Sequence, residues 1–450
     1  MKVILVSANT AEMPYPVYPI GMSMVAAAVR QAGHEVTCFD FLQSGRSPQA
    51  LRQELRRFEP EVVGISIRNV DNVNILNEER YVGGVRQLVQ CVRTATGAPV
   101  VLGGSGFSIM PERILSEVAA DYGVVGEGER IFVRFLNEAE KGHYPRHNTI
   151  LRDEERIPGR DIPSPAYLDT LLAGYLEEGS IAPVQTKRGC PHRCVYCSYP
   201  VLEGRGVRPR DPERVVDDIE SLIDEHGVQY VFFTDSVFND GEGTHMRVVR
   251  EMNERSLRVP WSAFFNPGGI RPAEVSEMKQ SGLQAAELGS DAACDRTLEG
   301  QRKPFNWEDV VRANTIFRKA GISTAHYFMF GGPAETPETV QEGIDNIKAL
   351  ECSAAFVFLG IRILPDTALE KIAVEEGLIS PGDDLLEPVY FFSPDVEKDV
   401  LEQRLMEAFE PLRHVIFPPG AMDDKLQLLH KLGHGGVLWD LLSPGLREEG

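Results

Sequence analysis

The chain lacks the features that would place it in a membrane or on a nucleic acid. It has no run of about eighteen apolar residues, the length that a transmembrane helix requires, and its first residues form an apolar segment without a signal-peptide cleavage pattern. Basic residues are in deficit, because 46 Lys and Arg face 67 Asp and Glu, and the net charge of −21 repels polyanions. These absences predict a cytoplasmic protein with no transmembrane segment and no nucleic-acid partner.

Cysteine is also scarce, and its distribution is uneven. Three of the seven cysteines, Cys190, Cys194 and Cys197, lie within one short segment. The other four are scattered in apolar or mixed surroundings that are typical of buried, reduced thiols: Cys38, Cys91, Cys294 and Cys352. The sequence therefore points to the segment around residues 188–198 as the chemical centre.

Three thiolates spaced i, i+4 and i+7 can face one metal cluster. A four-iron cluster normally takes four thiolates, so three of them leave one iron open to a small molecule. Structural zinc sites close with four ligands, usually from two Cys or Cys/His pairs, and the only further ligand near this loop is His192. Gly189 and Pro191 shape a turn at the first cysteine, which argues against ordinary loop thiols. The segment predicts a [4Fe-4S] cluster.

With Tyr196 before its last cysteine, the loop resembles the Cys-x-x-x-Cys-x-x-Cys signature of radical S-adenosylmethionine (SAM) enzymes. The resemblance implies that the open iron binds SAM. An electron from an external reductant, such as flavodoxin or ferredoxin, then cleaves SAM to a 5′-deoxyadenosyl radical, which removes hydrogen from an unactivated carbon. Cys190, Cys194 and Cys197 are thereby the predicted cluster ligands and catalytic residues, with Tyr196 beside the cofactor.

The first 148 residues alternate short apolar runs with amphipathic, helix-like segments. The runs at 3–7, 36–40, 62–67, 100–103 and 122–125 are apolar almost throughout, which is typical of parallel strands covered on both faces. An α/β, doubly wound Rossmann or flavodoxin-like domain is predicted. Such a sheet binds its ligand beyond the carboxyl ends of the strands.

Glycine and polar residues follow those strand ends. Gly103, Gly104 and Ser105 follow the fourth strand, and Asn69 and Asn72 follow the third. The glycine run is neither a G-x-G-x-x-G fingerprint nor a P-loop. Together with the cysteine loop downstream, the domain resembles the cobalamin-binding domain fused to many radical SAM enzymes, which implies that these glycines lie along the cobalamin nucleotide tail.

The Asp-x-His-x-x-Gly motif of methionine-synthase-type cobalamin domains is missing. The expectation is that no protein histidine binds cobalt and that water or the loop at 69–74 faces its lower side. An unrelated flavodoxin-like domain that only packs against the rest of the chain is the alternative.

A second, larger alternation of strands and helices begins near residue 181. Strands are predicted at 183–186, 230–234, 261–265, 285–288, 324–330 and 356–363, and these six units resemble the partial (β/α)6 barrel of radical SAM enzymes. The active site of such barrels lies at the carboxyl ends of the strands. The predicted organisation is a cobalamin-binding domain at 1–148, a proline-containing linker at 149–180, a radical SAM barrel at 181–375 and a mostly helical region at 376–450.

Residues after the barrel strands are assigned to SAM by the same resemblance. Asp235 replaces the usual Gly-Gly-Glu motif at the amino group, and Ser290 and Asp291 occupy the segment that contacts the methionine carboxylate and ribose. A second set is expected nearer the adenosyl group or the carboxylate: Gly331, Gly332 and Arg362.

Cobalamin beside a SAM cluster implies a division of labour. One SAM methylates cobalamin, a second generates the radical, and the substrate radical takes the methyl group from methylcobalamin. The leading hypothesis is therefore a cobalamin-dependent radical SAM methyltransferase acting on a hydrophobic or extended small molecule, such as a lipid, a tetrapyrrole or a natural product. A non-methylating cyclase, oxidase or rearrangement enzyme is the first alternative. An iron-sulfur electron-transfer or scaffold protein is the second.

Overall fold

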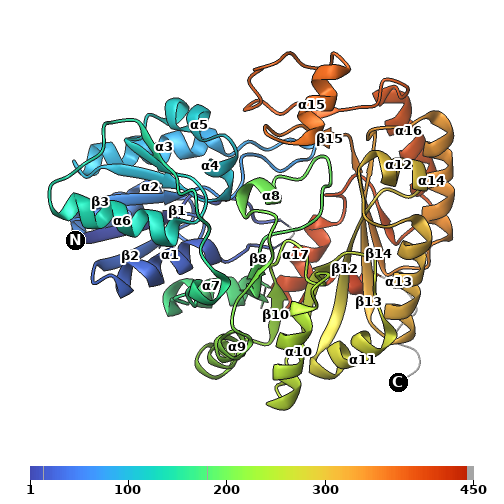
Figure 1. Ribbon diagram of the computed structural model, residues 1–450, viewed down its shortest axis with the longest axis horizontal. Helices are drawn as coiled ribbons and strands as arrows, with labels where there is room; N and C mark the ends of the chain where they lie inside the picture. The colour runs from blue at the N-terminus through green and yellow to red at the C-terminus, as the bar shows by residue number, and fades with distance from the viewer. Residues whose placement is uncertain (14, 180, 443–450) are drawn as a thin grey trace.

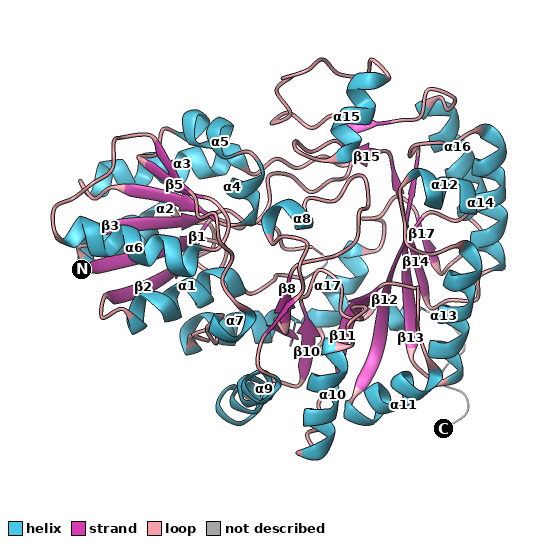
Figure 2. Ribbon diagram, viewed as in Figure 1, coloured by secondary structure: helices cyan, strands magenta, loops and turns pink. Residues whose placement is uncertain are grey.

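The computed structural model describes residues 1–13, 15–179 and 181–442. Two parallel sheets dominate it, one near the amino terminus and one in the second half of the chain (Figure 1). Helices flank both sheets (Figure 2). The α/β class with a doubly wound first domain and a partial barrel is confirmed.

The first sheet has six strands in the order β2-β1-β3-β4-β5-β6, all parallel. Its strands are β1 (Lys2–Ser7), β2 (Glu35–Asp40), β3 (Val62–Ser66), β4 (Val100–Gly103), β5 (Tyr122–Val124) and β6 (Thr149–Leu151). Its helices are α1 (Ile20–Gln31), α2 (Pro48–Phe58), α3 (Val82–Ala95), α4 (Ser105–Ile109), α5 (Pro111–Val118) and α6 (Gly128–Glu140). The order reverses between β1 and β3, and this switch point is where a doubly wound sheet places its ligand.

Both faces of this sheet are covered, as continuous apolar strands require. Along β1, Val3 and Leu5 pack in the core shared with α1 and α6, whereas Ile4 and Val6 pack in the core shared with α2, α3 and α5. No strand face remains for a ligand, so the domain can bind one only at its edge.

The segment at 149–180 differs from the predicted irregular linker. It contains β6, which pairs with β5 and extends the first sheet beyond residue 148, then η1 (Gly159–Asp161) and α7 (Asp169–Gly179). Tyr175 of α7 donates a hydrogen bond from its hydroxyl to Asp40 of β2 (2.9 Å). Prolines interrupt the segment without preventing these short elements, because each element lies between prolines rather than across one.

The second sheet has seven parallel strands in the order β17-β14-β13-β12-β11-β10-β7. They are β7 (Ile181–Val184), β10 (Tyr230–Phe233), β11 (Trp261–Phe265), β12 (Leu283–Asp291), β13 (Ser323–Phe330), β14 (Ala354–Leu359) and β17 (Val415–Ile416). Its helices are α9 (Pro212–His226), α10 (Thr244–Glu254), α11 (Pro272–Ser281), α12 (Asp295–Gly300), α13 (Trp307–Lys319) and α14 (Pro337–Ala349). The six predicted strands are present, and β17 from the C-terminal region adds a seventh.

The last predicted strand, 356–363, is divided in the structure. Gly360, with φ of +71°, separates β14 from β15 (Ile361–Arg362), which turns away and pairs antiparallel with β16 (Tyr390–Phe391). A glycine adopts this left-handed conformation at little cost. The break moves Arg362 out of the main sheet.

The C-terminal region is more than a helical appendage. It contains α15 (Ala368–Glu375), α16 (Lys398–Phe409), α17 (Asp423–Lys431) and η2 (Trp439–Leu442) as well as β17, and the end of its predicted range, 443–450, lies outside the described residues. Val437 and Trp439 pack in one core with residues from both ends of the strand order, Ile181 and Ile416. The sheet therefore curls around the C-terminal segment. Among the described residues, no helix is both long enough and apolar enough to span a bilayer.

Candidate active site at the cysteine loop

The cysteine loop follows β7 and the short strand β8 (Lys187–Arg188), which pairs with β9 (Arg208–Pro209). The Cys190 amide donates to the Gly204 carbonyl (3.1 Å), and the Val195 amide donates to the Gln301 carbonyl (3.1 Å). Gly189 has φ of +93°, and a Cβ there would lie 2.1 Å from a neighbouring carbonyl oxygen, so only glycine fits. Backbone contacts thus constrain the geometry of the loop.

All three cysteines of the loop are free thiols. Burial raises the pKa of Cys197 to about 12, and it raises the pKa values of Cys190 and Cys194 as well, with further increases from neighbouring thiols at Cys190 and Cys197 and from Asp291 at Cys194. Thiolates are the ligand form, so bound iron must supply the positive charge that stabilises them. The donor set fits a cluster that lacks one protein ligand.

A single zinc ion fits less well. Among the described residues, no group of three His, Cys, Asp or Glu side chains is arranged to hold one metal ion. His192 instead accepts a hydrogen bond on its ring Nε2 from the side-chain amide of Asn266 (2.9 Å). A four-iron cluster takes one thiolate per iron, so its ligands need not converge on a single point.

Tyr196 and Asp291, which the sequence assigned separately to the cofactor site, lie in contact beside the loop, and a third residue joins them. Lys303 and the Tyr196 hydroxyl both donate to the Asp291 carboxylate, and the Lys303 ammonium lies 3.5 Å from that hydroxyl. Lys303 also lowers the pKa of Cys194 against the dominant effect of burial. Sequence reasoning missed Lys303, because a lysine in a loop carries no pattern that identifies a buried cation.

Asp235 and Ser290 make contacts other than those expected with a ligand. Asp235 accepts hydrogen bonds from the Thr186 amide (2.8 Å) and from the Lys187 ammonium (3.1 Å), so its carboxylate anchors the start of the cysteine loop. Ser290 is fully buried and its hydroxyl hydrogen-bonds to His326 (2.8 Å). Alternation along β12 points Ser290 toward the helices, opposite to Asp291.

Gly331 and Gly332 follow β13 and donate their backbone amides to the Glu335 carboxylate, the second at 3.0 Å. Burial raises the pKa of Glu335 to about 7. A Cβ at Gly332 would lie 3.0 Å from the side-chain nitrogen of Gln301, a fully buried carboxamide that has no hydrogen-bond partner among the described residues. An unpaired buried amide is costly, so this position suits a polar ligand such as SAM.

Arg362 links the two halves of the chain. Its guanidinium donates to Asp71 in the loop after β3 (2.9 Å), and both side chains are buried. The remaining guanidinium donors reach the carbonyls of Ile363 and Leu385, each at 2.6 Å. The guanidinium predicted to contact the SAM carboxylate or adenine edge therefore already has protein partners.

The edge of the first sheet presents the predicted cobalamin loops together. Gly104 has φ of +97°, and a Cβ there would lie 2.4 Å from the Ile67 carbonyl, so the loops after β3 and β4 lie against each other. Ser105 donates from its hydroxyl to the Arg68 carbonyl (2.7 Å). A Cβ at Gly103 would meet nothing closer than 3.8 Å. The loop after β3 borders the β1/β3 switch point and the loop after β4 lies next to it, and an uncrowded glycine there fits a large planar cofactor.

The two predicted asparagines in this edge differ in role. Asn72 accepts on its side-chain oxygen from the amides of Asn74 (3.3 Å) and Glu79 (3.1 Å), which organises its own loop. Asn69 lies where a Cβ on Gly106 would approach its backbone within 3.0 Å. The Asn69 backbone therefore packs against α4, whereas the Asn72 side chain is committed to its own loop.

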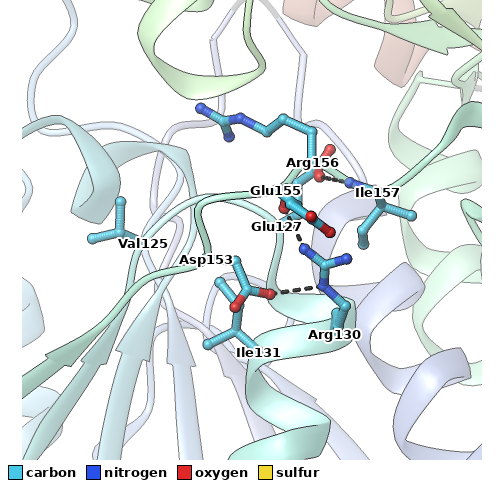
Figure 3. A pocket seen from close by; sticks show the side chains of 8 residues that line it. All are labelled: Val125, Glu127, Arg130, Ile131, Asp153, Glu155, Arg156 and Ile157. Carbon is cyan, nitrogen blue, oxygen red and sulfur yellow. Dashed lines mark hydrogen bonds and ion pairs between the residues drawn. The ribbon is translucent and has the colours of Figure 1, made fainter.

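The loop after β5 joins the cysteine loop through buried ion pairs. Arg188, two residues before Cys190, pairs with Glu129 and with Glu127 (3.3 Å), and Arg208 also pairs with Glu127 (2.7 Å). The small pocket beside these residues is polar, and several of its charges are paired, as Arg130 with Asp153 (2.7 Å) (Figure 3). This region fixes the two domains to each other.

Two family matches divide the chain as the geometry does. The B12 binding domain family matches residues 6–136, and the Radical SAM superfamily matches residues 184–347. Cobalamin, SAM and a [4Fe-4S] cluster are the cofactors that these two domains imply, and the donor sets described above fit them.

Individual relatives support the same combination. The chain is 25% identical to a tryptophan 2-C-methyltransferase of Streptomyces laurentii, over 82% of this chain and 74% of the relative. It is 26% identical to an anaerobic magnesium-protoporphyrin IX monomethyl ester cyclase of Cereibacter sphaeroides, over 76% of this chain and 59% of the relative. The fold matches the radical S-adenosylmethionine methyltransferase TsrM from Kitasatospora setae, solved with tryptophan and a SAM analogue, with a TM-score of 0.86, 24% identity and coverage of 98% and 97%.

Proposed function

We propose that this chain, a radical SAM protein with an N-terminal B12-binding domain, is an enzyme that methylates an unactivated carbon of a small molecule. The observation that carries the proposal is the fixed placement of the cysteine loop and the barrel against the edge loops of the first sheet. Arg188 ties the cysteine loop to Glu127 and Glu129, and Arg362 ties the barrel to Asp71. An electron carrier has no need for two cofactor sites held together by buried charges.

The bound cofactors supply chemistry that no side chain has: a radical that removes hydrogen from an unactivated carbon, and a methyl group on cobalt. The chain's own residues position the cofactors and balance their charge. Cys190, Cys194 and Cys197 hold the cluster, and Lys303 offsets thiolate charge at Cys194. Gly103, Gly104, Ser105 and Asn69 are proposed to line cobalamin, and Gln301, Gly331 and Gly332 to line SAM.

The finer parts of the proposal concern partners. A hydrophobic or extended small molecule is the proposed substrate, in keeping with the aromatic side chains that the barrel strands carry on their inner face. Flavodoxin or ferredoxin is the proposed source of electrons. A cytoplasmic location, where thiols stay reduced, suits a cluster held by three cysteines.

Mass spectrometry of the products tests the function. The full-length protein is reconstituted anaerobically with iron, sulfide and cobalamin and then incubated with reductant and SAM that carries a deuterated methyl group. Formation of both 5′-deoxyadenosine and S-adenosylhomocysteine supports a radical methyltransferase. S-adenosylhomocysteine alone indicates methyl transfer without a radical step.

Two other outcomes count against the proposal. 5′-Deoxyadenosine alone favours a non-methylating enzyme, and the magnesium-protoporphyrin cyclase to which the chain is similar is the precedent for this alternative. Intact SAM in cluster-loaded protein would indicate an electron-transfer or scaffold protein. Cys194→Ala is the inactive control, and Cys352→Ser, which changes a buried cysteine outside the loop, is its matched active control.

A further inference from the structure

One strand of the barrel carries a large apolar side chain that solvent reaches. Phe264 is 39% exposed, although its strand neighbours Ala263 and Phe265 are buried at 0% and 2%. Alternation sends those neighbours to the helices, where Phe265 meets the Phe317 ring of α13 (5.2 Å). Phe264 therefore faces the opposite side of the sheet, here called the inner face.

Aromatic rings from four strands line this inner face. The Phe264 ring lies 5.4 Å from Phe232 of β10 and 5.9 Å from Tyr327 of β13, and Tyr327 stacks on Phe356 of β14 at 5.1 Å. Tyr15 from the N-terminal loop and Trp439 from η2 pack in the same cluster, and all of these residues except Phe264 belong to one apolar core. The exposed Phe264 ring shows that this lining is open to solvent on one side.

A carboxyl group lies among these rings. Glu287 is on β12, between β11 and β13 in the sheet, and is 3% exposed. Its Oε2 accepts from the Tyr327 hydroxyl (2.8 Å), and its Oε1 accepts from the Trp439 indole (3.3 Å). Within the described ranges, no Lys, Arg or His forms an ion pair with Glu287. Each carboxylate oxygen retains a lone pair for a further donor.

We propose that Glu287 and the surrounding aromatic rings form a substrate subsite that holds a protonated amine carried on an apolar, ring-bearing molecule. A buried carboxylate without a counterion is costly, and a ligand cation removes that cost. Aromatic faces attract the same cation through their quadrupoles. Burial raises the pKa of Glu287 to about 7. A cation bound beside the carboxylate would lower this pKa again.

The subsite also sets the orientation of the substrate. Glu287 precedes Asp291 by four residues on β12, and an irregularity between Leu288 and Asp291 shortens the separation along the strand to roughly 10 Å. Asp291 contacts Tyr196 of the cysteine loop. An amine held at Glu287 therefore leaves the rest of the molecule extending toward the cluster, where the reacting carbon has to be. This inference rests on the proposed function, since it names the class of molecule that is methylated.

The subsite is tested by the binding of three probes that each carry a phenyl ring but differ in charge. Reconstituted full-length protein, kept without reductant so that no turnover occurs, is titrated with phenethylamine, 2-phenylethanol and 3-phenylpropionate by saturation-transfer NMR and calorimetry. The cationic amine is expected to bind more tightly than the neutral alcohol, and the anion more weakly than either. An equal or reversed order would overturn the proposal.

Variants separate recognition from a structural role. Glu287→Gln removes the charge and keeps one oxygen acceptor, which can serve either Tyr327 or Trp439, so amine binding should weaken at least about tenfold while alcohol binding changes little. Glu287→Asp should recover part of the amine affinity. Glu254→Gln, on the exposed end of α10, is the control for the loss of one charge. Equal weakening of amine and alcohol in Glu287→Gln would assign Glu287 a structural role instead.

A second variant keeps the test decisive if Glu287→Gln does not fold. Phe264→Leu changes a ring that solvent already reaches, and it should weaken amine binding about two- to fivefold. Unchanged amine binding in Phe264→Leu would contradict the subsite. The product assay is independent of these titrations, so methylation with no amine binding would remove the inference and leave the proposed function intact.

Discussion

The two parallel sheets of this protein use their faces differently. In the first sheet, helices cover both faces, so the side chains of β1 are divided between two apolar cores. In the second sheet, helices cover the outer face, and the inner face carries aromatic rings, Glu287 and the C-terminal Trp439. One domain can therefore offer only its edge loops to a ligand, whereas the other offers strand side chains as well.

This difference decides which kind of residue carries function in each half. At the edge of the first sheet, the backbone matters most, as at Gly104 with its left-handed conformation. In the barrel, side chains matter, as at the three cysteines, Lys303 and Glu287. Substitutions can test whether the backbone of the first sheet and the side chains of the barrel contribute separately.

Loss of one cysteine ligand should have the largest effect. Cys194→Ala is expected to abolish cluster assembly and SAM cleavage, because a cluster with two protein ligands is poorly held. Cobalamin binding should persist, since it belongs to the other sheet. Iron and sulfide content together with cobalamin titration measure this, and retention of a full cluster in the variant would refute the ligand assignment.

Loss of one partner in the buried pair between the domains should have the next largest effect. Asp71→Asn leaves the Arg362 guanidinium buried without its counterion, and the free energy of unfolding is expected to fall by about 3–5 kcal/mol. Urea denaturation measures the change. Glu54→Gln, which removes the pair with the exposed Arg57, should have a much smaller effect because solvent screens that pair. Equal effects of the two variants would show that burial of the pair is unimportant.

The pH dependence of stability provides a test of Glu335 in the barrel. Its folded-state pKa is raised from 4.5 to about 7, so the folded state binds the proton more tightly than the unfolded state. This stabilisation is fully present below pH 4.5 and is lost as the pH rises through 7, by up to about 3 kcal/mol.

Glu335→Gln isolates that contribution. The variant keeps an acceptor for the amides of Gly331 and Gly332 but cannot titrate. Its unfolding free energy should vary less between pH 5 and 8 than that of the wild-type protein, as measured by chemical denaturation at several pH values. Parallel curves would mean that Glu335 has an ordinary pKa.

The smallest expected effect is at the edge of the first sheet. Gly104→Ala places a Cβ against the Ile67 carbonyl in a left-handed conformation, and it should cost about 1–3 kcal/mol and weaken cobalamin binding measurably. Gly97→Ala is the matched control, because a Cβ there meets nothing within 4 Å. Spectrophotometric cobalamin titration compares the two. Equal affinities would separate this loop from cobalamin.

Much of the fold could be predicted because its signals are local. Asp211, Pro212 and Gly227 predict the limits of α9, and the structure confirms them, with Asp211 as the N-cap and Gly227 in a left-handed C-cap. Asn306 and Asp309 likewise form the capping box of α13. The strand β17 was missed because two residues carry too little pattern, and only pairing with β14 defines it.

The candidate site was predictable to a smaller extent. The cysteine spacing was sufficient to predict the cluster ligands, since three thiols on one short loop need no distant partner. A polar residue after a strand can instead bind a neighbouring segment of the protein, as three predicted ligand contacts show. Asp235 accepts a hydrogen bond from Lys187, and Ser290 hydrogen-bonds to His326. Arg362 forms an ion pair with Asp71.

Most strands of the two parallel sheets and the cysteine loop could be predicted from the residue pattern, because these signals lie in short stretches of the chain. Only the tertiary structure decided which charges are paired and which face of a strand is open. Arg188 donates a hydrogen bond to Glu129, 59 positions away, and Glu287 accepts one from Trp439, 152 positions away. The polarity of β12 alone cannot reveal such partners, because a buried charge is defined by what the folded chain brings to it.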